Sequence, residues 1–154
     1  MQIVAVADVH GNGEALQKVL ESENATHIFC LGDGVREYET AAQNAPDRVF
    51  HIVSGNCDWA GDYPTVGLDI LGGKRILFLH GHTNFVKRSL EPALALSRHN
   101  KADLLLFGHT HRFFTQQDGA VLACNPGSLG FDGTYAVLRW NGEHGDITVE
   151  KKEV

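Results

Sequence analysis

The sequence predicts an α/β fold that begins with parallel strands and ends with antiparallel ones. Short runs of β-branched and apolar residues recur along the chain, glycine-flanked polar clusters follow them, and helical patterns separate the first of these runs. In the last third, Asp118-Gly119 and Asn141-Gly142 each lie between β-like segments, which is typical of hairpins. No linker or low-complexity segment divides the 154 residues, so we expect one domain over residues 1–154.

Strands and helices alternate in the first third of the chain. Strands are expected at residues 3–7, 27–31 and 49–53, where apolar and β-branched residues run together. The first strand leads into a helix with an apolar stripe, which consists of Ala15, Leu16, Val19 and Leu20. A second helix over residues 37–44 ends before Pro46, because the residue before a proline disfavours the helical conformation.

The remaining elements mix hairpins with one helix. Residues 66–71 and 75–79 form a hairpin through Gly72-Gly73, since glycine readily adopts the positive φ angles of a tight turn. A helix over residues 89–100, with a proline in its first turn, precedes a buried strand at 104–107. Two more hairpins are expected, at residues 113–124 and 135–149.

The composition excludes several classes of protein. A formal net charge of −6 disfavours a dedicated nucleic-acid-binding region, because such binding depends on Lys and Arg. The apolar runs are far shorter than the roughly 18 residues that span a bilayer. A strand-like run starts at residue 2 and would be destroyed by signal-peptide processing, so we expect no signal peptide. The three cysteines show no CxxC spacing and predict neither disulfides nor a cysteine zinc site. We expect a cytoplasmic protein.

Polar side chains follow five of the predicted strands, at the point where each strand ends. Ligands of open α/β sheets bind at this carboxyl edge, so these side chains should meet there. Carboxylate, amide and imidazole groups of this kind are metal ligands, and seven exceed what one tetrahedral ion uses. Two ions that share a carboxylate would use all of them. The predicted ligands are Asp8, His10, Asp33, Asn56, His80, His109 and His111.

Five motifs resemble the signature of the calcineurin-like metallophosphoesterases. They are D-x-H at residues 8–10, G-D at 32–33, G-N-x-D at 55–58, H-G-H at 80–82 and G-H-T-H at 108–111. The short chain and the cysteine in Gly55-Asn56-Cys57-Asp58 make this sequence most similar to the small bacterial and archaeal phosphodiesterase branch of that family. The resemblance implies a four-layer α-β-β-α sandwich of two mixed sheets flanked by helices, whereas the residue pattern alone predicts parallel strands that end at one sheet edge.

The resemblance also implies how the ligands divide. Asp8, His10 and His111 would hold one metal ion, Asn56, His80 and His109 the other, and Asp33 would bridge them. This mixture of ligands favours divalent transition metals over Mg²⁺ or Ca²⁺, which prefer all-oxygen shells. Mn²⁺ is our first choice, with Fe, Zn²⁺ or Ni²⁺ as alternatives.

The predicted function is a dinuclear metal-dependent phosphodiesterase that uses a metal-bridging hydroxide for in-line attack on the phosphorus of a small phosphoester. Asp33, His80, His109 and Asp58 are the predicted catalytic residues, although Asp58 could equally cap a helix. Arg36, His82 and Asn56 are predicted to contact substrate; Arg36 could instead be an exposed loop charge, and His82 could orient His80 or face solvent.

Several points remain open from the sequence. Cys57 stands where many relatives have a histidine thought to protonate the leaving group, and a thiol with a pKa of about 8.5 replaces it poorly. Residues 125–128 either line the substrate cleft or form a simple turn. The alternative functions are a phosphomonoesterase, a nuclease, or a non-catalytic protein-binding scaffold like the retromer subunit that resembles this family. A homo-oligomer is possible in each case.

Overall fold

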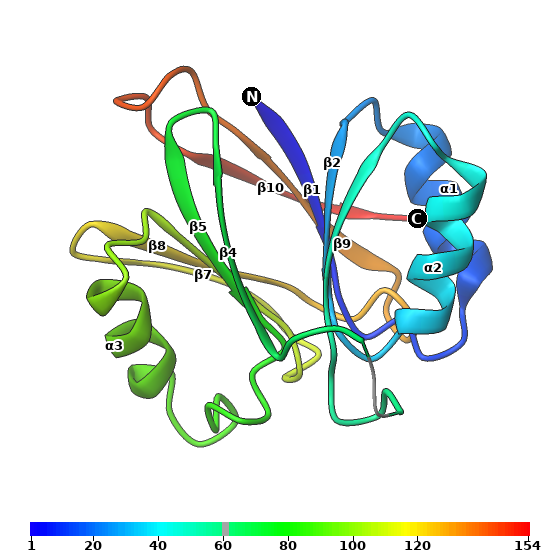
Figure 1. Ribbon diagram of the computed structural model, residues 1–154, viewed down its shortest axis with the longest axis horizontal. Helices are drawn as coiled ribbons and strands as arrows, with labels where there is room; N and C mark the ends of the chain where they lie inside the picture. Colours follow the sequence, from blue (N-terminus) through cyan, green and yellow to red (C-terminus); the bar gives the residue numbers. More distant parts are fainter. Residues whose placement is uncertain (60–61) are drawn as a thin grey trace.

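The computed structural model describes residues 1–59 and 62–154, which form two five-stranded sheets with helices on their outer faces (Figure 1). The first sheet has the order β10-β9-β1-β2-β3, in which β1, β2 and β3 are parallel and β9 and β10 are antiparallel to their neighbours. Its strands are β1 (Gln2–Val6), β2 (His27–Leu31), β3 (Val49–Val53), β9 (Thr134–Arg139) and β10 (Thr148–Glu153).

The second sheet has the order β4-β5-β6-β8-β7. Its three central strands are parallel, and the edge strands β4 and β7 pair antiparallel. Its strands are β4 (Val66–Leu71), β5 (Lys74–Leu79), β6 (Leu104–Phe107), β7 (Phe113–Asp118) and β8 (Val121–Pro126). Glycines 72 and 73, which join β4 to β5, both have positive φ angles, as the predicted tight turn requires.

Three helices complete the four layers. α1 (Gly13–Ser22) and α2 (Val35–Asn44) cover the first sheet, and α3 (Glu91–His99) covers the second (Figure 1). Each of the three interfaces between layers has its own cluster of buried apolar side chains, and the central cluster draws on both sheets. The four-layer sandwich of two mixed sheets is therefore confirmed. None of the helices in the described ranges has the length and apolarity needed to cross a membrane.

The strands with parallel neighbours do not all meet at the edge of one sheet, and the prediction from the residue pattern alone was wrong on this point. β5, β6 and β8 form the centre of the second sheet because β4 pairs with β5 and not with β3. The last hairpin also differs, since β10 begins only at Thr148, where it pairs with Arg139. Buried Trp140 donates from Nε1 to the Gly72 carbonyl, 3.0 Å away, which holds the intervening loop against the other sheet.

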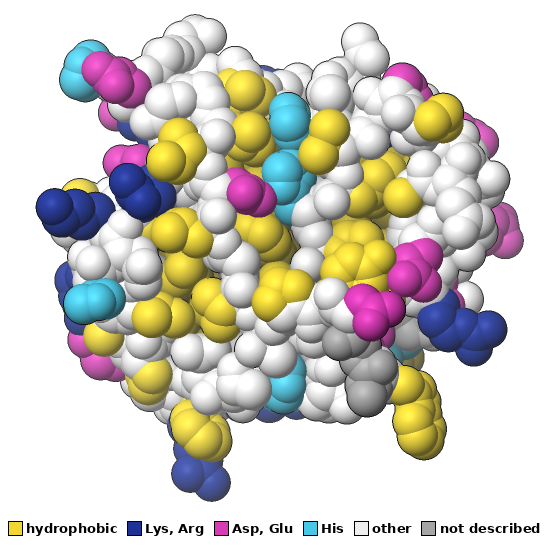
Figure 2. Space-filling view, in the orientation of Figure 1, with side chains coloured by type: hydrophobic (Ala, Val, Ile, Leu, Met, Phe, Trp, Pro, Cys, Tyr) yellow, Lys and Arg dark blue, Asp and Glu magenta, His cyan; other side chains and the backbone are white. Residues whose placement is uncertain are grey.

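A hydrogen-bonded group joins the edges of the two sheets. His51 on β3 lies 2.7 Å from the carboxylate of Asp69 on β4, and its other ring nitrogen lies 3.0 Å from His27 Nδ1. Figure 2 shows histidine and acidic side chains together in the seam on this face. This group is distinct from the predicted metal ligands, which follow the C-terminal ends of β1, β2, β3, β5 and β6.

Candidate metal centre

The loops that follow five strands bring the predicted ligands together in strained backbone conformations. β1, β2 and β3 deliver ligands from the first sheet, and β5 and β6 deliver them from the second. Holding a non-glycine residue at positive φ costs on the order of 1–3 kcal/mol, and such strain clusters at functional sites. Five of the seven predicted ligands have φ angles between 46° and 70°: Asp8, His10, Asp33, His109 and His111.

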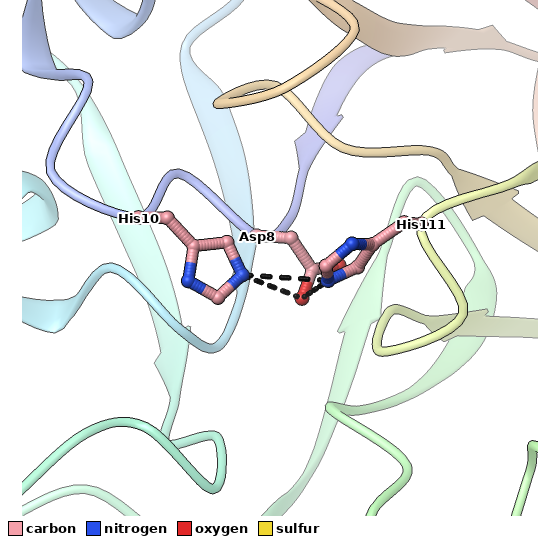
Figure 3. A group of neighbouring side chains, drawn as sticks. All are labelled: Asp8, His10 and His111. Atoms are coloured by element: carbon pink, nitrogen blue, oxygen red, sulfur yellow. Dashed lines mark hydrogen bonds and ion pairs between the residues drawn. The ribbon is translucent and has the colours of Figure 1, made fainter.

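Asp8, His10 and His111, which we call the first ligand group, converge at the end of β1 and β6 (Figure 3). The Nε2 atoms of the two histidines lie 3.4 Å apart, and Asp8 Oδ1 lies 3.7 Å from His10 Nε2 and 3.3 Å from His111 Nε2. Asp8 is fully buried, and its Oδ1 has no hydrogen-bond partner among the described residues. A buried carboxylate oxygen without a partner is costly unless a cation neutralises it.

Asn56, His80 and His109 form the second ligand group. His80 Nε2 lies 3.0 Å from Asn56 Oδ1 and 3.1 Å from His109 Nδ1. The other ring nitrogen of His80, Nδ1, lies 2.7 Å from the carbonyl oxygen of Leu31, to which it donates. In the neutral ring this contact keeps the proton on Nδ1 and leaves the lone pair of Nε2 facing the other ligands, as a metal-binding histidine requires.

Asp33 lies between the two groups. Its Oδ2 is 3.7 Å from His10 Nε2 in the first group and 3.4 Å from His80 Nε2 in the second. Its Oδ1 accepts a hydrogen bond from the backbone N–H of Cys57, at 2.8 Å, which fixes the carboxylate. Asp33 therefore lies within 4 Å of a histidine in each group. Asp8 Oδ1 also reaches the second group, at 3.9 Å from His80 Nε2, but it lies closer to His111 Nε2, at 3.3 Å.

This arrangement fits two metal ions. Ligand bonds of about 2.0–2.2 Å, 90–109° apart, place neighbouring ligand atoms roughly 2.8–3.6 Å from each other. Most of the distances given above lie in or near this range, and the atoms that face one another are electron-pair donors. The chemistry of the set, with Asp8 Oδ1 buried and without a hydrogen-bond partner among the described residues, thus suits divalent metal cations.

In the metal-free protein, burial and neighbouring charges shift the pKa values of three of the ligand residues. Burial opposes the ionisation of Asp33, but its hydrogen bond to His80 and the charge of that ring outweigh burial and hold its pKa well below the usual range. Burial raises the pKa of Asp8 despite nearby His80 and His111. Burial and then the charge of His80 lower the pKa of His109 to about 4, so this imidazole is neutral and free to bind a metal at neutral pH.

Asp58 makes contacts that a helix cap makes. Its Oδ2 accepts from the backbone N–H groups of Asp33 and Gly55, at 2.8 and 2.7 Å, and its Oδ1 accepts from those of Gly34 and Val35, both at 3.0 Å. This tertiary cap explains why α2 begins at Val35, two residues before the start that the sequence predicts. The catalytic role of Asp58 stays a prediction.

A cleft of about 540 Å³ opens beside the metal centre. Arg36, which the sequence predicts to contact substrate, lies here on the exposed side of α2. Residues 125–128 are not among the described residues that line this cleft. The lining consists of His10, Gly11, Asp33, Gly34, Val35, Arg36, Glu37, Glu39, Cys57, Asp58, Trp59, Asp62 and Tyr63.

His82 and Cys57 flank the predicted ligands, and the Cys57 sulfur lies close enough to His10 and Asp33 to join them around an ion. The His82 ring lies 5.3 Å from that of His80, and its Nδ1 is buried without a hydrogen-bond partner among the described residues. The contact that orients His80 comes from Leu31 and not from His82. Burial, and then the charge of Asp33, raises the pKa of the Cys57 thiol, which makes Cys57 a still weaker proton donor than an ordinary cysteine.

The segment from Asn125 to Phe131 supports the ligands from behind, a role that the sequence alone did not reveal. The Asn125 amide donates to the Gly108 carbonyl at 2.9 Å and to Thr110 Oγ1 at 3.0 Å, next to His109. Ser128 Oγ donates to the Asp8 carbonyl at 2.9 Å. The ring of Phe131 lies against those of His10 and His111. The sequence offered one signal for this role: Phe131 is an apolar residue in a glycine-rich loop, where a polar residue is more usual.

Comparison with known proteins agrees with this geometry. The calcineurin-like phosphoesterase superfamily domain matches residues 1–142. The chain is 31% identical over 129 residues to the probable metallophosphoesterase YsnB of Bacillus subtilis. The aligned region covers 84% of this chain and 75% of the relative. It is 30% identical over 153 residues to the phosphodiesterase YfcE of Escherichia coli, with 84% and 79% covered.

A solved structure shows the same fold. The crystal structure of Vps29 from Entamoeba histolytica in complex with Zn²⁺ superposes with a TM-score of 0.78 at 20% identity, over 99% of each chain. At that identity the likeness shows the fold alone. The matched domain over most of the chain, the curated relatives and the four-layer sandwich together show that the chain belongs to the calcineurin-like phosphoesterase superfamily.

Proposed function

We propose that this protein is a dinuclear metal-dependent phosphodiesterase. The observation that carries the proposal is the meeting of two ligand groups on one carboxylate, Asp33, beside the Oδ1 of Asp8, which is buried with no hydrogen-bond partner in the part of the chain that the structure describes. The similarity to YfcE, a phosphodiesterase, supports the choice of a diester over a monoester. The first ligand group would hold one ion and the second ligand group the other, with Asp33 common to both.

The residues of the chain have separate tasks in this proposal. A pair of divalent cations supplies two things when bound: activation of a water and neutralisation of phosphate charge. Asp33 is held by the Cys57 N–H so that its Oδ2 faces both groups. His80 is fixed by the Leu31 carbonyl, so its Nε2 points inward. No side chain is required as a nucleophile, and the leaving group receives its proton from a donor other than the Cys57 thiol.

The cleft indicates which esters are suitable. Beyond the metal ligands and Asp58, its ionisable lining side chains include Glu37, Glu39 and Asp62, against a single guanidinium, Arg36. Tyr63 donates to the carboxylate of Glu39 at 3.1 Å, and Trp59 is 94% exposed at the mouth. Carboxylates repel additional phosphates, so we propose a small diester whose leaving group is uncharged or cationic. The Arg36 guanidinium would donate hydrogen bonds to the phosphate oxygens.

Mn²⁺ is the proposed metal, with Fe, Zn²⁺ or Ni²⁺ as alternatives, because the ligands combine imidazole with carboxylate and amide oxygens. Asn56 and His82 are proposed to face the substrate phosphate. From the composition we propose a cytoplasmic location and neither a membrane partner nor a dedicated nucleic-acid-binding region. A homo-oligomer is proposed from the family resemblance and not from the composition.

The experiment pairs metal content with hydrolysis. Purified protein loaded with Mn²⁺ is expected to bind two equivalents and to hydrolyse bis(4-nitrophenyl) phosphate much faster than an alkyl phosphomonoester. Asp33→Asn should lower this rate by about 100-fold or more, because both ions lose a ligand. Asp47→Asn, which changes an exposed carboxylate after α2, serves as the control and should keep the rate.

The same measurement separates the alternative function. Vps29 has this fold, so a binding scaffold is the second candidate. Two equivalents of metal without hydrolysis of any diester would favour the scaffold. Equal or reversed rates on the diester and the monoester would favour a phosphomonoesterase.

A further inference from the structure

We propose that Ser128 and Phe131 are positioning residues that hold the first ligand group, Asp8, His10 and His111, and leave the second group untouched. Both residues lie in the loop between β8 and β9, and neither is itself a predicted metal ligand. The proposal rests on the dinuclear centre proposed above. It predicts that the two metal sites depend on different parts of the fold.

Ser128 secures the backbone of Asp8. The serine is fully buried, its Oγ donates to the Asp8 carbonyl at 2.9 Å, and the same Oγ accepts from the Phe131 N–H at 3.2 Å. The Gly130 N–H donates to the same Asp8 carbonyl at 3.0 Å. Asp8 has a φ of 54°, a conformation that surrounding contacts must impose. Two hydrogen bonds that hold the Asp8 backbone therefore come from the loop between β8 and β9.

Gly130 makes this approach sterically possible. A Cβ on residue 130 would lie 2.2 Å from the carbonyl oxygen of Val9, well inside any allowed contact. The loop thus lies directly against the turn that carries Asp8 and His10. Because the approach is this close, a change in the loop is transmitted to the turn without an intervening layer of side chains.

Phe131 secures the two imidazoles. Its ring centroid lies 5.1 Å from that of His10 and 5.3 Å from that of His111, so one phenyl ring contacts both. The phenylalanine is 68% exposed, and burial of its own surface is therefore a minor reason for its position. The two histidines are themselves partly exposed, and the phenyl ring restricts the orientations that they can adopt.

The second ligand group is held by other means. His80 is fully buried and bonded to the Leu31 carbonyl, and Asn56 and His109 contact His80 directly. The His109 backbone N–H donates to Asp8 Oδ2 at 3.0 Å, but the ring of His109 is positioned by His80. Within the described ranges, no side chain of residues 128–131 makes a hydrogen bond or a ring contact to Asn56, His80 or His109. Loss of Ser128 or Phe131 should consequently weaken one metal site only.

The test is a titration of the metal-free protein with Co²⁺. Binding is measured by calorimetry and by the visible absorption of the bound ion. Wild type should bind two ions. Outer contacts of metal ligands change affinity by about 10–100-fold, so Ser128→Ala and Phe131→Ala should each weaken one ion by about 10-fold or more and leave the other unchanged. Ser128→Thr, which keeps the hydroxyl, should retain most of the wild-type affinity for this ion.

Matched controls separate positioning from general damage. Ser97 is a fully buried serine whose hydroxyl donates to the Ala93 carbonyl at 2.8 Å in α3, so Ser97→Ala makes the same chemical change far from the metal centre. Ile70 on β4 is 61% exposed, so Ile70→Ala removes a comparable exposed apolar side chain. Both should bind two ions with wild-type affinity.

A second pair of variants assigns the weakened ion. In an Asn56→Ala background the surviving ion should occupy the first group, and adding Ser128→Ala should weaken it. In a His111→Ala background the surviving ion should occupy the second group, and adding Ser128→Ala should change nothing. Equal weakening of both ions, or of neither, would overturn the proposal. A wild type that binds a single ion would instead contradict the dinuclear centre.

Discussion

Replacing Asp58 with asparagine tests whether this residue supports the metal centre through the fold. The change substitutes one oxygen by an amino group at almost constant volume. The carboxylate now accepts four backbone N–H groups, from Asp33, Gly34, Val35 and Gly55. Asparagine keeps one acceptor oxygen and turns an NH₂ donor toward two of these N–H groups, which leaves them without a partner.

The size of the effect follows from these contacts. A hydrogen bond to a charged group contributes about 1.5–3 kcal/mol, and a carboxylate at a helix N-terminus adds roughly 0.3–1 kcal/mol. Because Asp58 is only partly buried, we expect the free energy of unfolding to fall by about 2–4 kcal/mol. For a chain of this length, that corresponds to a midpoint lower by roughly 4–16 °C.

The assay is thermal and urea unfolding of the metal-free protein, followed by circular dichroism. Asp47→Asn, at an exposed carboxylate, is the control and should unfold like wild type. If Asp58 acted only in catalysis, Asp58→Asn would lose activity at an unchanged midpoint. That result would refute the structural role described above, and a lowered midpoint with retained metal binding and activity would argue against any catalytic role.

Three further predictions concern pH, metal and packing. Burial, and then His51, lowers the pKa of His27, so the stability that this residue contributes is complete above its unfolded pKa of about 6.5 and is lost as the pH falls below that value. The urea midpoint of the metal-free protein should therefore drop between pH 7.5 and 5.5 by more in wild type than in His27→Asn, and equal drops would contradict this. Removal of the metals with a chelator should lower the thermal midpoint, because ions at 100 times their dissociation constant stabilise a one-site protein by about 2.7 kcal/mol; an unchanged midpoint would argue against metal bound to the folded state. Tyr38→Phe removes a buried hydroxyl that donates to the Gly32 carbonyl at 2.9 Å, and it should cost about 1 kcal/mol in urea unfolding while activity persists; no measurable cost would mean that water or another group replaces this bond.

Much of the local structure was predictable from the sequence because it depends on short-range patterns. Runs of apolar residues mark the strands, and β2, β3, β4 and β6 begin and end where the pattern predicts. Glycine pairs mark the turn between β4 and β5 because positive φ angles are required there. The predicted ligands were found in the same way, since each follows a strand directly and carries a side chain that binds metals.

The sequence by itself thus determined which segments are strands and which side chains follow them, because periodicity and turn chemistry are properties of neighbouring residues. The tertiary structure alone decided that these strands divide between two sheets, that Asp58 caps a helix more than twenty residues away in the chain, and that Ser128 and Phe131 lie against the first ligand group. Strand pairing and contacts across the chain depend on how distant segments pack, and a local pattern carries no information about the partner.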